Sequence, residues 1–222
     1  MDDVSYLLRV SLSDRPGSLG QLAVGLGTVG ADIRSLEVVE RGDGYAVDDI
    51  VVELPPHALP DTLITAAEKV DGVHVDSLRP FNDKLDIHQE LELIDAVAAA
   101  RGDRLQVLAD LAPRGLNTSW AMVVSQPGPR TVLLAASSGA PETPLEQVDW
   151  LPLPHACGFT PDARWVPEAW REWDQRLAAA PIGDGSKALL LGRVGGPEFR
   201  PSEVARVGYL TGIVSTLLGS AR

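Results

Sequence analysis

Hydrophobic and polar residues alternate near the start of the chain and then change to a helical spacing. Apolar residues at every second position of residues 6–12 predict a strand with one buried face. Over residues 18–29 the apolar positions recur at intervals of three and four, which is typical of an amphipathic helix. Gly30 then ends this predicted helix. The chain therefore opens with a predicted strand followed by a helix.

Similar patterns continue to about residue 80. Predicted strands at residues 33–40 and 45–54 flank the sequence Arg-Gly-Asp-Gly at residues 41–44, which is typical of a hairpin turn. A helix at residues 59–70 and a strand at residues 73–78 follow. This βαββαβ order predicts an antiparallel four-stranded sheet with two helices on one face, the ferredoxin-like arrangement.

Beyond a short boundary at residues 79–83, the pattern predicts helices before and after a second sheet. The predicted elements are helices at residues 85–100 and 105–112, the latter ended by Pro113, strands at residues 120–124, 131–136 and 187–194, and a terminal helix at residues 201–218. The predicted fold class is therefore α+β, with a ferredoxin-like domain at residues 1–80 and an α+β domain with an antiparallel sheet at residues 84–222.

Composition narrows the classes of function. The 222 residues carry a formal charge of −12 and contain no basic block, which argues against binding of nucleic acid or of an anionic membrane. No apolar run is long enough to span a bilayer, and the start Met1-Asp2-Asp3 is unlike a secretory signal. The lone Cys157 excludes an internal disulfide. We therefore expect a cytoplasmic protein.

The loop of residues 14–19, the 14–19 loop below, carries the strongest functional signal. It leaves a predicted strand at Asp14, turns through Pro16 and Gly17, and enters a predicted helix. Backbone N–H groups at a helix start attract carboxylates, and glycine has no Cβ to keep a ligand away. An ordinary strand-to-helix turn is the alternative interpretation of this segment alone.

Residues 8–38, reading LRVSLSDRPGSLGQLAVGLGTVGADIRSLEV, resemble an ACT domain. The shared features are a first strand ending in Asp and Pro-Gly, an apolar helix, and a Gly-x-Asn/Asp-Ile start to the second strand. The resemblance implies a regulatory module that binds a small ligand, usually an amino acid, between paired domains. The ligand-binding residues that it implies are Asp14, Arg15, Pro16, Gly17, Ser18, Leu19, Asp32 and Ile33.

Asp32 departs from the family pattern, in which many members have Asn at this position. An ionised Asp only accepts hydrogen bonds, so Asp32 could hold a ligand ammonium or amide but not a carboxylate. The alternative is a turn residue that bonds nearby backbone N–H groups.

The end of the chain resembles a GAF domain over residues 188–193, 196–199 and 202–205. That resemblance implies a sensor or dimerisation scaffold. Residues 137–182 are expected to be rich in loops and to lack the usual strands that line a ligand pocket. Four tryptophans in this stretch either cover a core beneath long loops or form an exposed surface for a partner: Trp150, Trp165, Trp170 and Trp173.

No catalytic or metal site is predicted. The sequence contains no phosphate loop, dinucleotide fingerprint or metalloprotease helix, so no cofactor is expected. His155 and Cys157 lack the second ligand pair that a zinc site needs. An enzyme with catalytic groups among Asp149, His155, Cys157 and Asp162 remains an alternative.

The leading hypothesis is a non-enzymatic regulator that binds an amino acid at an interface between two copies of the chain. The expected partners are that amino acid, a second copy in a homodimer, and a regulated enzyme of unspecified kind. Apolar residues spread around the terminal helix also favour a dimer: Val204, Val207, Leu210, Val214, Leu217 and Leu218. A third hypothesis is an interaction subunit whose first domain has lost its ligand.

Overall fold

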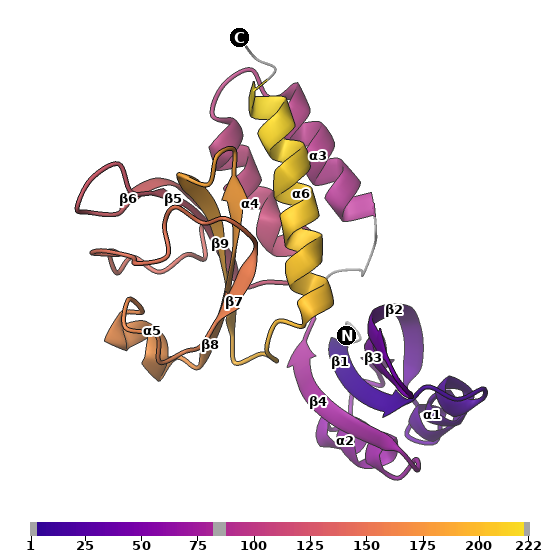
Figure 1. Cartoon of the computed structure of the whole chain (residues 1–222). Coiled ribbons are helices and arrows are strands. Elements are labelled where there is room, and N and C mark those ends of the chain that lie inside the picture. The colour runs from indigo at the N-terminus through magenta and orange to yellow at the C-terminus, as the bar shows by residue number, and fades with distance from the viewer. Residues whose placement is uncertain (1–3, 82–87, 220–222) are drawn as a thin grey trace. The chain divides into compact units, whose positions relative to one another are not determined.

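The computed structural model describes residues 4–81 and 88–219 (Figure 1). The chain divides into two compact units, Met1–Asp86 and Ile87–Arg222. Part of the predicted boundary at residues 79–83 and the predicted helix start at residue 85 lie outside the described residues. Within those residues, no helix combines the length and apolarity needed to cross a membrane.

The N-terminal unit has the predicted βαββαβ order. Its elements are β1 (Val4–Ser13), α1 (Ser18–Gly27), β2 (Asp32–Gly42), β3 (Tyr45–Leu54), α2 (Asp61–Glu68) and β4 (Val73–Pro80). The strands pair antiparallel in the order β2-β3-β1-β4, so β2 and β4 are the edges. The predicted α+β class and ferredoxin-like arrangement are confirmed.

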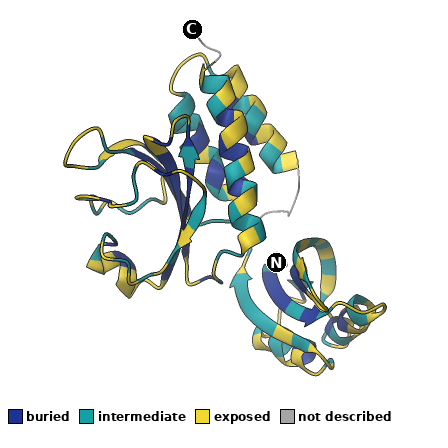
Figure 2. Cartoon of the chain, in the orientation of Figure 1, coloured by how far each residue is buried: buried dark blue, intermediate teal, exposed yellow. Residues whose placement is uncertain are grey.

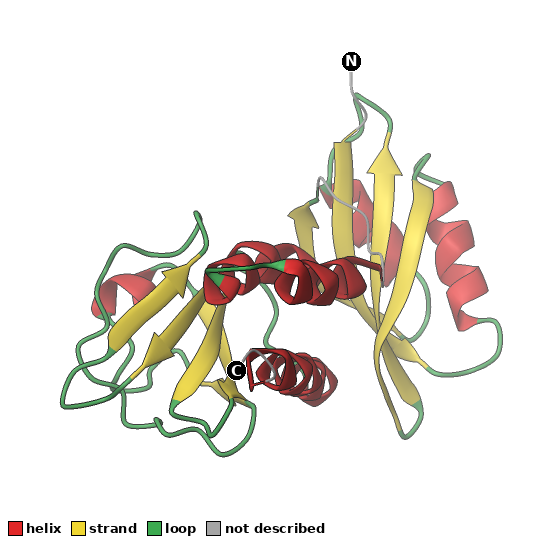
Figure 3. Cartoon of the chain, turned by 90° about the horizontal axis from the view of Figure 1, so that it is seen from above, coloured by secondary structure: helices red, strands yellow, loops and turns green. Residues whose placement is uncertain are grey.

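The two faces of this sheet differ in chemistry. The helices α1 and α2 cover one face of the sheet (Figure 3). There, apolar side chains of β1 and β3 pack against Leu22 and Leu26 of α1 and Leu63 of α2. On the opposite face, Arg9 of β1 forms a two-pronged ion pair with Asp49 of β3, at 2.6 Å from Nε to Oδ1 and 2.7 Å from Nη2 to Oδ2. Both residues are 1% exposed, so this is a buried charge pair.

The C-terminal unit contains a five-stranded antiparallel sheet in the order β6-β5-β9-β8-β7. Its elements are α3 (His88–Ala99), α4 (Arg104–Gly115), β5 (Trp120–Ser125), β6 (Val132–Ala136), β7 (Cys157–Phe159), α5 (Glu168–Glu172), β8 (Gln175–Ile182), β9 (Lys187–Val194) and α6 (Pro201–Gly219).

Both faces of this second sheet are covered along its inner strands β5, β8 and β9, which Figure 2 shows as buried, whereas the edge strand β6 is largely exposed. Ala121 and Val123 point toward the helices α3, α4 and α6, whereas the alternate residues Trp120 and Met122 point toward loops and α5. A strand buried on both faces loses the apolar–polar alternation of a half-exposed strand. This explains the continuous apolar run of β5.

Two expectations for this unit are wrong. Residues 137–182 are rich in loops, as expected, but they do contain strands, since β7 lies among them and β8 pairs along its whole length with β9. The β8 sequence QRLAAAPI has one β-branched residue and a proline, so its strand propensity is low and tertiary pairing decides its structure. Pro113 does not end α4, which continues to Gly115. In the last turn a proline forfeits only one helical hydrogen bond.

The tryptophans mainly cover a core. Trp170 is 1% exposed and packs edge-to-face on Trp120, with ring centroids 5.1 Å apart. Trp150 and Trp165 are half-buried and pack against each other at 5.4 Å. Trp173, in contrast, is 59% exposed. The core-covering interpretation therefore holds for three of the four residues and not for Trp173.

Candidate functional site

The 14–19 loop is an exposed turn held in shape by its own backbone. The Asp14 N–H donates to the Gly44 carbonyl at 3.1 Å, and the Ser18 N–H donates to the Arg15 carbonyl at 3.1 Å. Gly17 is the N-cap of α1 with φ 96° and ψ −14°, in the left-handed region. Glycine adopts this conformation without strain, which explains why it stands here.

The start of α1 carries an uncompensated positive pole. No side chain makes a capping hydrogen bond to it, and its first turn contains no acidic residue. The Ser18 N–H donates to the Arg15 carbonyl and the Gln21 N–H donates to the Gly17 carbonyl at 2.9 Å, so the donors that remain at the helix start are the N–H groups of Leu19 and Gly20. Aligned peptide dipoles make such a terminus favourable for a negatively charged group.

Charged side chains of the loop and of β2 lie around this turn and leave it exposed. The Arg41 Nε at the end of β2 lies 3.9 Å from the Asp14 Oδ2, and both side chains are well exposed. The Arg15 Nη2 donates to the Ser13 hydroxyl at 3.3 Å. Exposed pairs of this kind contribute little to stability, so these side chains are free to rearrange around a ligand.

Asp48 is a residue of this region that the sequence analysis missed. It lies on β3, opposite Val10 of β1 and Val38 of β2, and alternation along β3 places it on the sheet face that carries α1. Asp48 is 1% exposed, and its Oδ1 has no hydrogen-bond partner among the described residues. Such an oxygen is costly to leave buried.

The electrostatic surroundings connect Asp48 with the 14–19 loop. Burial raises the pKa of the Asp48 carboxyl, the guanidinium of Arg41 opposes this rise, and the negative charges of Asp14 and Asp49 add to it. Asp14 is the first residue of the loop, and Arg41 lies beside it. Only spatial pairing of three separate segments brings these groups together, so no local motif could have identified Asp48.

Asp32 and Ile33 lie at the other end of the same sheet. Asp32 pairs with Glu53 of β3, whereas Ser13, just before the loop, pairs with Tyr45. At about 3.3 Å per residue, the length of β3 between these partners is about 26 Å. One copy of the chain therefore cannot bring Asp32 and the 14–19 loop to the same small ligand.

Asp32 also has a partner of its own. Its Oδ2 lies 3.3 Å from Nη1 of Arg34, and the Asp32 side chain is 68% exposed. Ile33 is half-buried against the apolar core of the unit. Of the predicted ligand-binding residues, the structure thus groups the 14–19 loop in one place and puts Asp32 and Ile33 in another.

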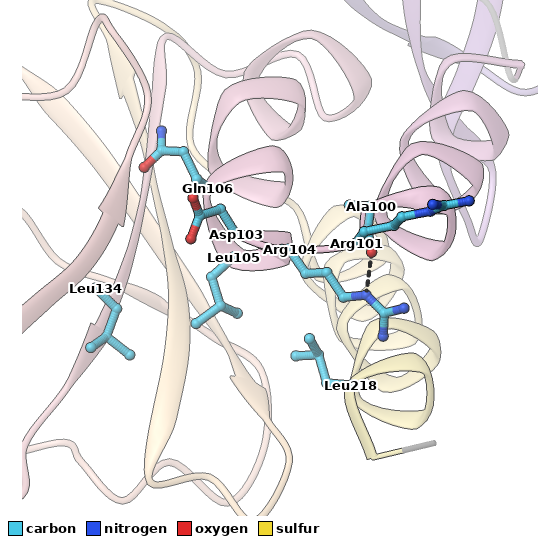
Figure 4. Close-up of a pocket in the computed structure, with 9 residues that line it drawn as sticks. Ala100, Arg101, Asp103, Arg104, Leu105, Gln106, Leu134 and Leu218 are labelled. Atoms are coloured by element: carbon cyan, nitrogen blue, oxygen red, sulfur yellow. Dashed lines mark hydrogen bonds between the residues drawn. The ribbon is translucent and has the colours of Figure 1, made fainter. Parts of the chain in front are cut away.

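The hollows among the described residues of the C-terminal unit include the two that follow. One, of about 690 Å³, lies beside the α3–α4 turn and is bordered by Arg104, Leu134 and Leu218 (Figure 4). Arg104 donates to the carbonyls of Ala100 and Leu217, both at 2.9 Å, and so ties the ends of α3 and α6 together. A smaller apolar hollow of about 180 Å³ lies between β5, β6 and residues 141–145.

The residues of the enzyme alternative form no metal-binding cluster: the described residues contain no group of three or more His, Cys, Asp or Glu side chains suited to a metal ion. Asp149, His155 and Asp162 are exposed, and Cys157 is half-buried in β7. Burial raises the pKa of the Cys157 thiol. This favours the thiol over the nucleophilic thiolate.

No protein-family model matches the sequence, and no curated protein matches it. Similar solved structures include the ACT domain of a GTP pyrophosphokinase from Chlorobium tepidum, with 19% identity, 36% of this chain and 100% of that chain covered, and a TM-score of 0.27. The GAF domain of an Acinetobacter phosphoenolpyruvate-protein phosphotransferase has 10% identity, covers 63% of this chain and 96% of that chain, and has a TM-score of 0.48.

A third similar structure, an unknown protein from Galdieria sulphuraria, covers 99% of this chain and 94% of that chain, with 12% identity and a TM-score of 0.34. Identities and scores this low assign the chain to no family. Its α+β architecture is established by the strand orders and pairings of the two sheets.

Proposed function

We propose that this chain is a non-enzymatic regulatory protein whose N-terminal unit binds a small effector, an amino acid, at the start of α1. The observation that carries the proposal is the left-handed Gly17 at the N-cap of a helix that no side chain caps. This arrangement offers backbone donors and a positive pole to a carboxylate, which every amino acid has, whatever its side chain.

The proposed regulator acts as a pair of chains. The edge strand β2 spans 11 residues, with Leu36 and Val38 each 41% exposed, and a long apolar edge invites another strand. Antiparallel pairing of β2 with β2 across a twofold axis places the start of one strand beside the end of the other. Asp32 of one copy then lies near the 14–19 loop of the second copy.

We expect sedimentation at micromolar concentration to give a dimer or a higher even oligomer, because pairing covers the exposed β2 edge. The terminal helix does not support this expectation as the sequence suggested. Val207, Leu210 and Val214 are buried inside the C-terminal unit, and Leu217 and Leu218 pack against the same core. A monomeric mass would contradict the paired site.

A thermal-shift screen of the parent chain against the twenty standard amino acids tests the binding itself. A ligand at a hundred times its dissociation constant stabilises the native state by about 2.7 kcal/mol. The alternative of an interaction subunit that has lost its ligand predicts no shift with any of them.

We expect Gly17→Val to abolish binding of the amino acid identified in that screen. A β-branched side chain would obstruct the backbone donors at the start of α1. Valine at φ 96° is also strained by roughly 1–3 kcal/mol, so calorimetry must be done on folded protein. Unchanged affinity in the folded variant would refute the site assignment.

Gly183→Val is the matched control for backbone strain. Gly183 has φ 70° and, like Gly17, has no neighbouring heavy atom within 4 Å of an added Cβ, but it belongs to the C-terminal unit. This variant is expected to lose comparable stability and to keep the parent's affinity. Equal loss of binding in both variants would mean that destabilisation alone, and not the start of α1, explains the Gly17→Val result.

A further inference from the structure

Asp48 and Asp49 are adjacent, buried acidic residues that differ in their hydrogen-bond partners. Asp49 is buried with both carboxylate oxygens bonded to Arg9. Asp48 is equally buried, at 1% exposed, yet its Oδ1 has no hydrogen-bond partner among the described residues. Burying an unpaired polar group is unfavourable, and unpaired buried groups are therefore rare in native proteins. We therefore expect a group of a bound ligand to pair with the Asp48 carboxylate.

The position of Asp48 relates it to the start of α1. Both belong to the same face of the sheet, since Asp48 neighbours Val10, which packs in the core beneath α1. Asp14, the first residue of the 14–19 loop, and Arg41 beside it are near enough to alter the pKa of the Asp48 carboxyl. A negative carboxylate and a positive helix start therefore occur in one region.

These two poles complement an α-amino acid, which carries a carboxylate and an ammonium on one carbon atom. We propose that the carboxylate of Asp48 binds the ligand's ammonium while the start of α1 binds its carboxylate. This inference rests on the proposed function and adds a second contact between the protein and the ligand. It also explains why an amino acid, and not a simple carboxylic acid, would be the ligand.

Asp32 suits the ammonium less well than Asp48 does. The Asp32 carboxylate is exposed to water and already lies 3.3 Å from Arg34, so a ligand would have to compete with both. A charge-assisted bond in a buried site is stronger than one in water. Because Asp48 is covered, its covering side chains must move when the ligand binds, and the carboxylate becomes paired in the bound state.

Calorimetry on the full chain tests this inference with two probes: the best-binding amino acid of the screen, and the carboxylic acid with the same side chain but no amino group. The parent is expected to bind the amino acid more tightly than the analogue. In Asp48→Asn, affinity for the amino acid should fall about tenfold or more and affinity for the analogue should hardly change.

Asp43→Asn is the matched control, since it removes one negative charge from an exposed turn near the loop and leaves the turn chemistry intact. It should alter neither affinity. If Asp48→Asn does not fold, as judged by circular dichroism, Asp48→Ser replaces it in the same comparison.

Parent-like affinity of Asp48→Asn for the amino acid would overturn the inference and leave the proposed function standing. If Asp32→Asn lost affinity for the amino acid but not for the analogue, and Asp48→Asn kept both affinities, the ammonium would be assigned to Asp32. That result would also overturn the inference. If the parent binds none of the twenty amino acids, the proposed function fails, and the role of Asp48 fails with it.

Discussion

Replacing Arg9 by methionine is expected to destabilise the N-terminal unit by about 3–5 kcal/mol, a large fraction of the stability of a small domain. The substitution removes the guanidinium and leaves the Asp49 carboxylate buried and without its two-pronged partner. Burying a single charge in this way costs far more than losing an exposed ion pair.

The five tryptophans allow this loss to be assigned to one unit. All of them belong to the C-terminal unit, so tryptophan fluorescence follows that unit, whereas far-ultraviolet circular dichroism follows both. Arg9→Met should shift the urea transition seen by circular dichroism and spare the one seen by fluorescence. The double variant Arg9→Met/Asp49→Leu should recover much of the loss; a double variant as unstable as the single one would contradict the charge-burial explanation.

Asp48→Asn is expected to have the opposite effect and to stabilise the unliganded N-terminal unit by about 1–3 kcal/mol at pH 7. The parent must bury a carboxylate with an unpaired oxygen, whereas the neutral amide has a smaller desolvation cost. For a domain of this size the melting temperature should rise by roughly 4–8 °C per kcal/mol. A variant that is both more stable and weaker in binding is the signature of a functional residue.

The raised pKa of Asp48 determines how the stability of the parent changes with pH. Burial raises the folded-state pKa of Asp48 above 3.8, so the folded chain holds the proton more tightly than the unfolded chain. Stability of the parent therefore falls as the pH rises from about 3.8 through the folded-state pKa. The advantage of Asp48→Asn should be absent below pH 3.8 and full at neutral pH. An equal advantage at both pH values would argue against an ionised, buried Asp48.

Local patterns were sufficient for most of the N-terminal unit. Alternation and the Asp43-Gly44 turn predicted β3 with its observed bounds, Tyr45–Leu54, and the order of elements predicted the sheet. The 14–19 loop was identified for the same reason, since a turn through Pro-Gly into a helix is local. In the C-terminal unit, β8 was missed because its alanines take strand structure only through pairing with β9.

Asp48 could not be found in this way. As a sequence, Tyr-Ala-Val-Asp-Asp-Ile-Val-Val suggests a strand with two acidic residues on opposite faces. Nothing local shows that Arg9 binds one of them and that one oxygen of the other has no hydrogen-bond partner among the described residues. The separation of Asp32 from the 14–19 loop likewise follows from the register of β1 and β2 on β3. Both facts arise from pairings between distant segments.

The placement of Asp32 and the loop at opposite ends of one sheet has a consequence for how affinity depends on dilution. A site made of the 14–19 loop and Asp48 is complete within a single chain, so its dissociation constant should be the same at nanomolar and micromolar protein. A site that also needs Asp32 exists only in the assembled pair, and mass action would then weaken binding as the protein is diluted. The fraction of the protein that binds ligand would in that case depend on the concentration of the protein as well as on that of the ligand.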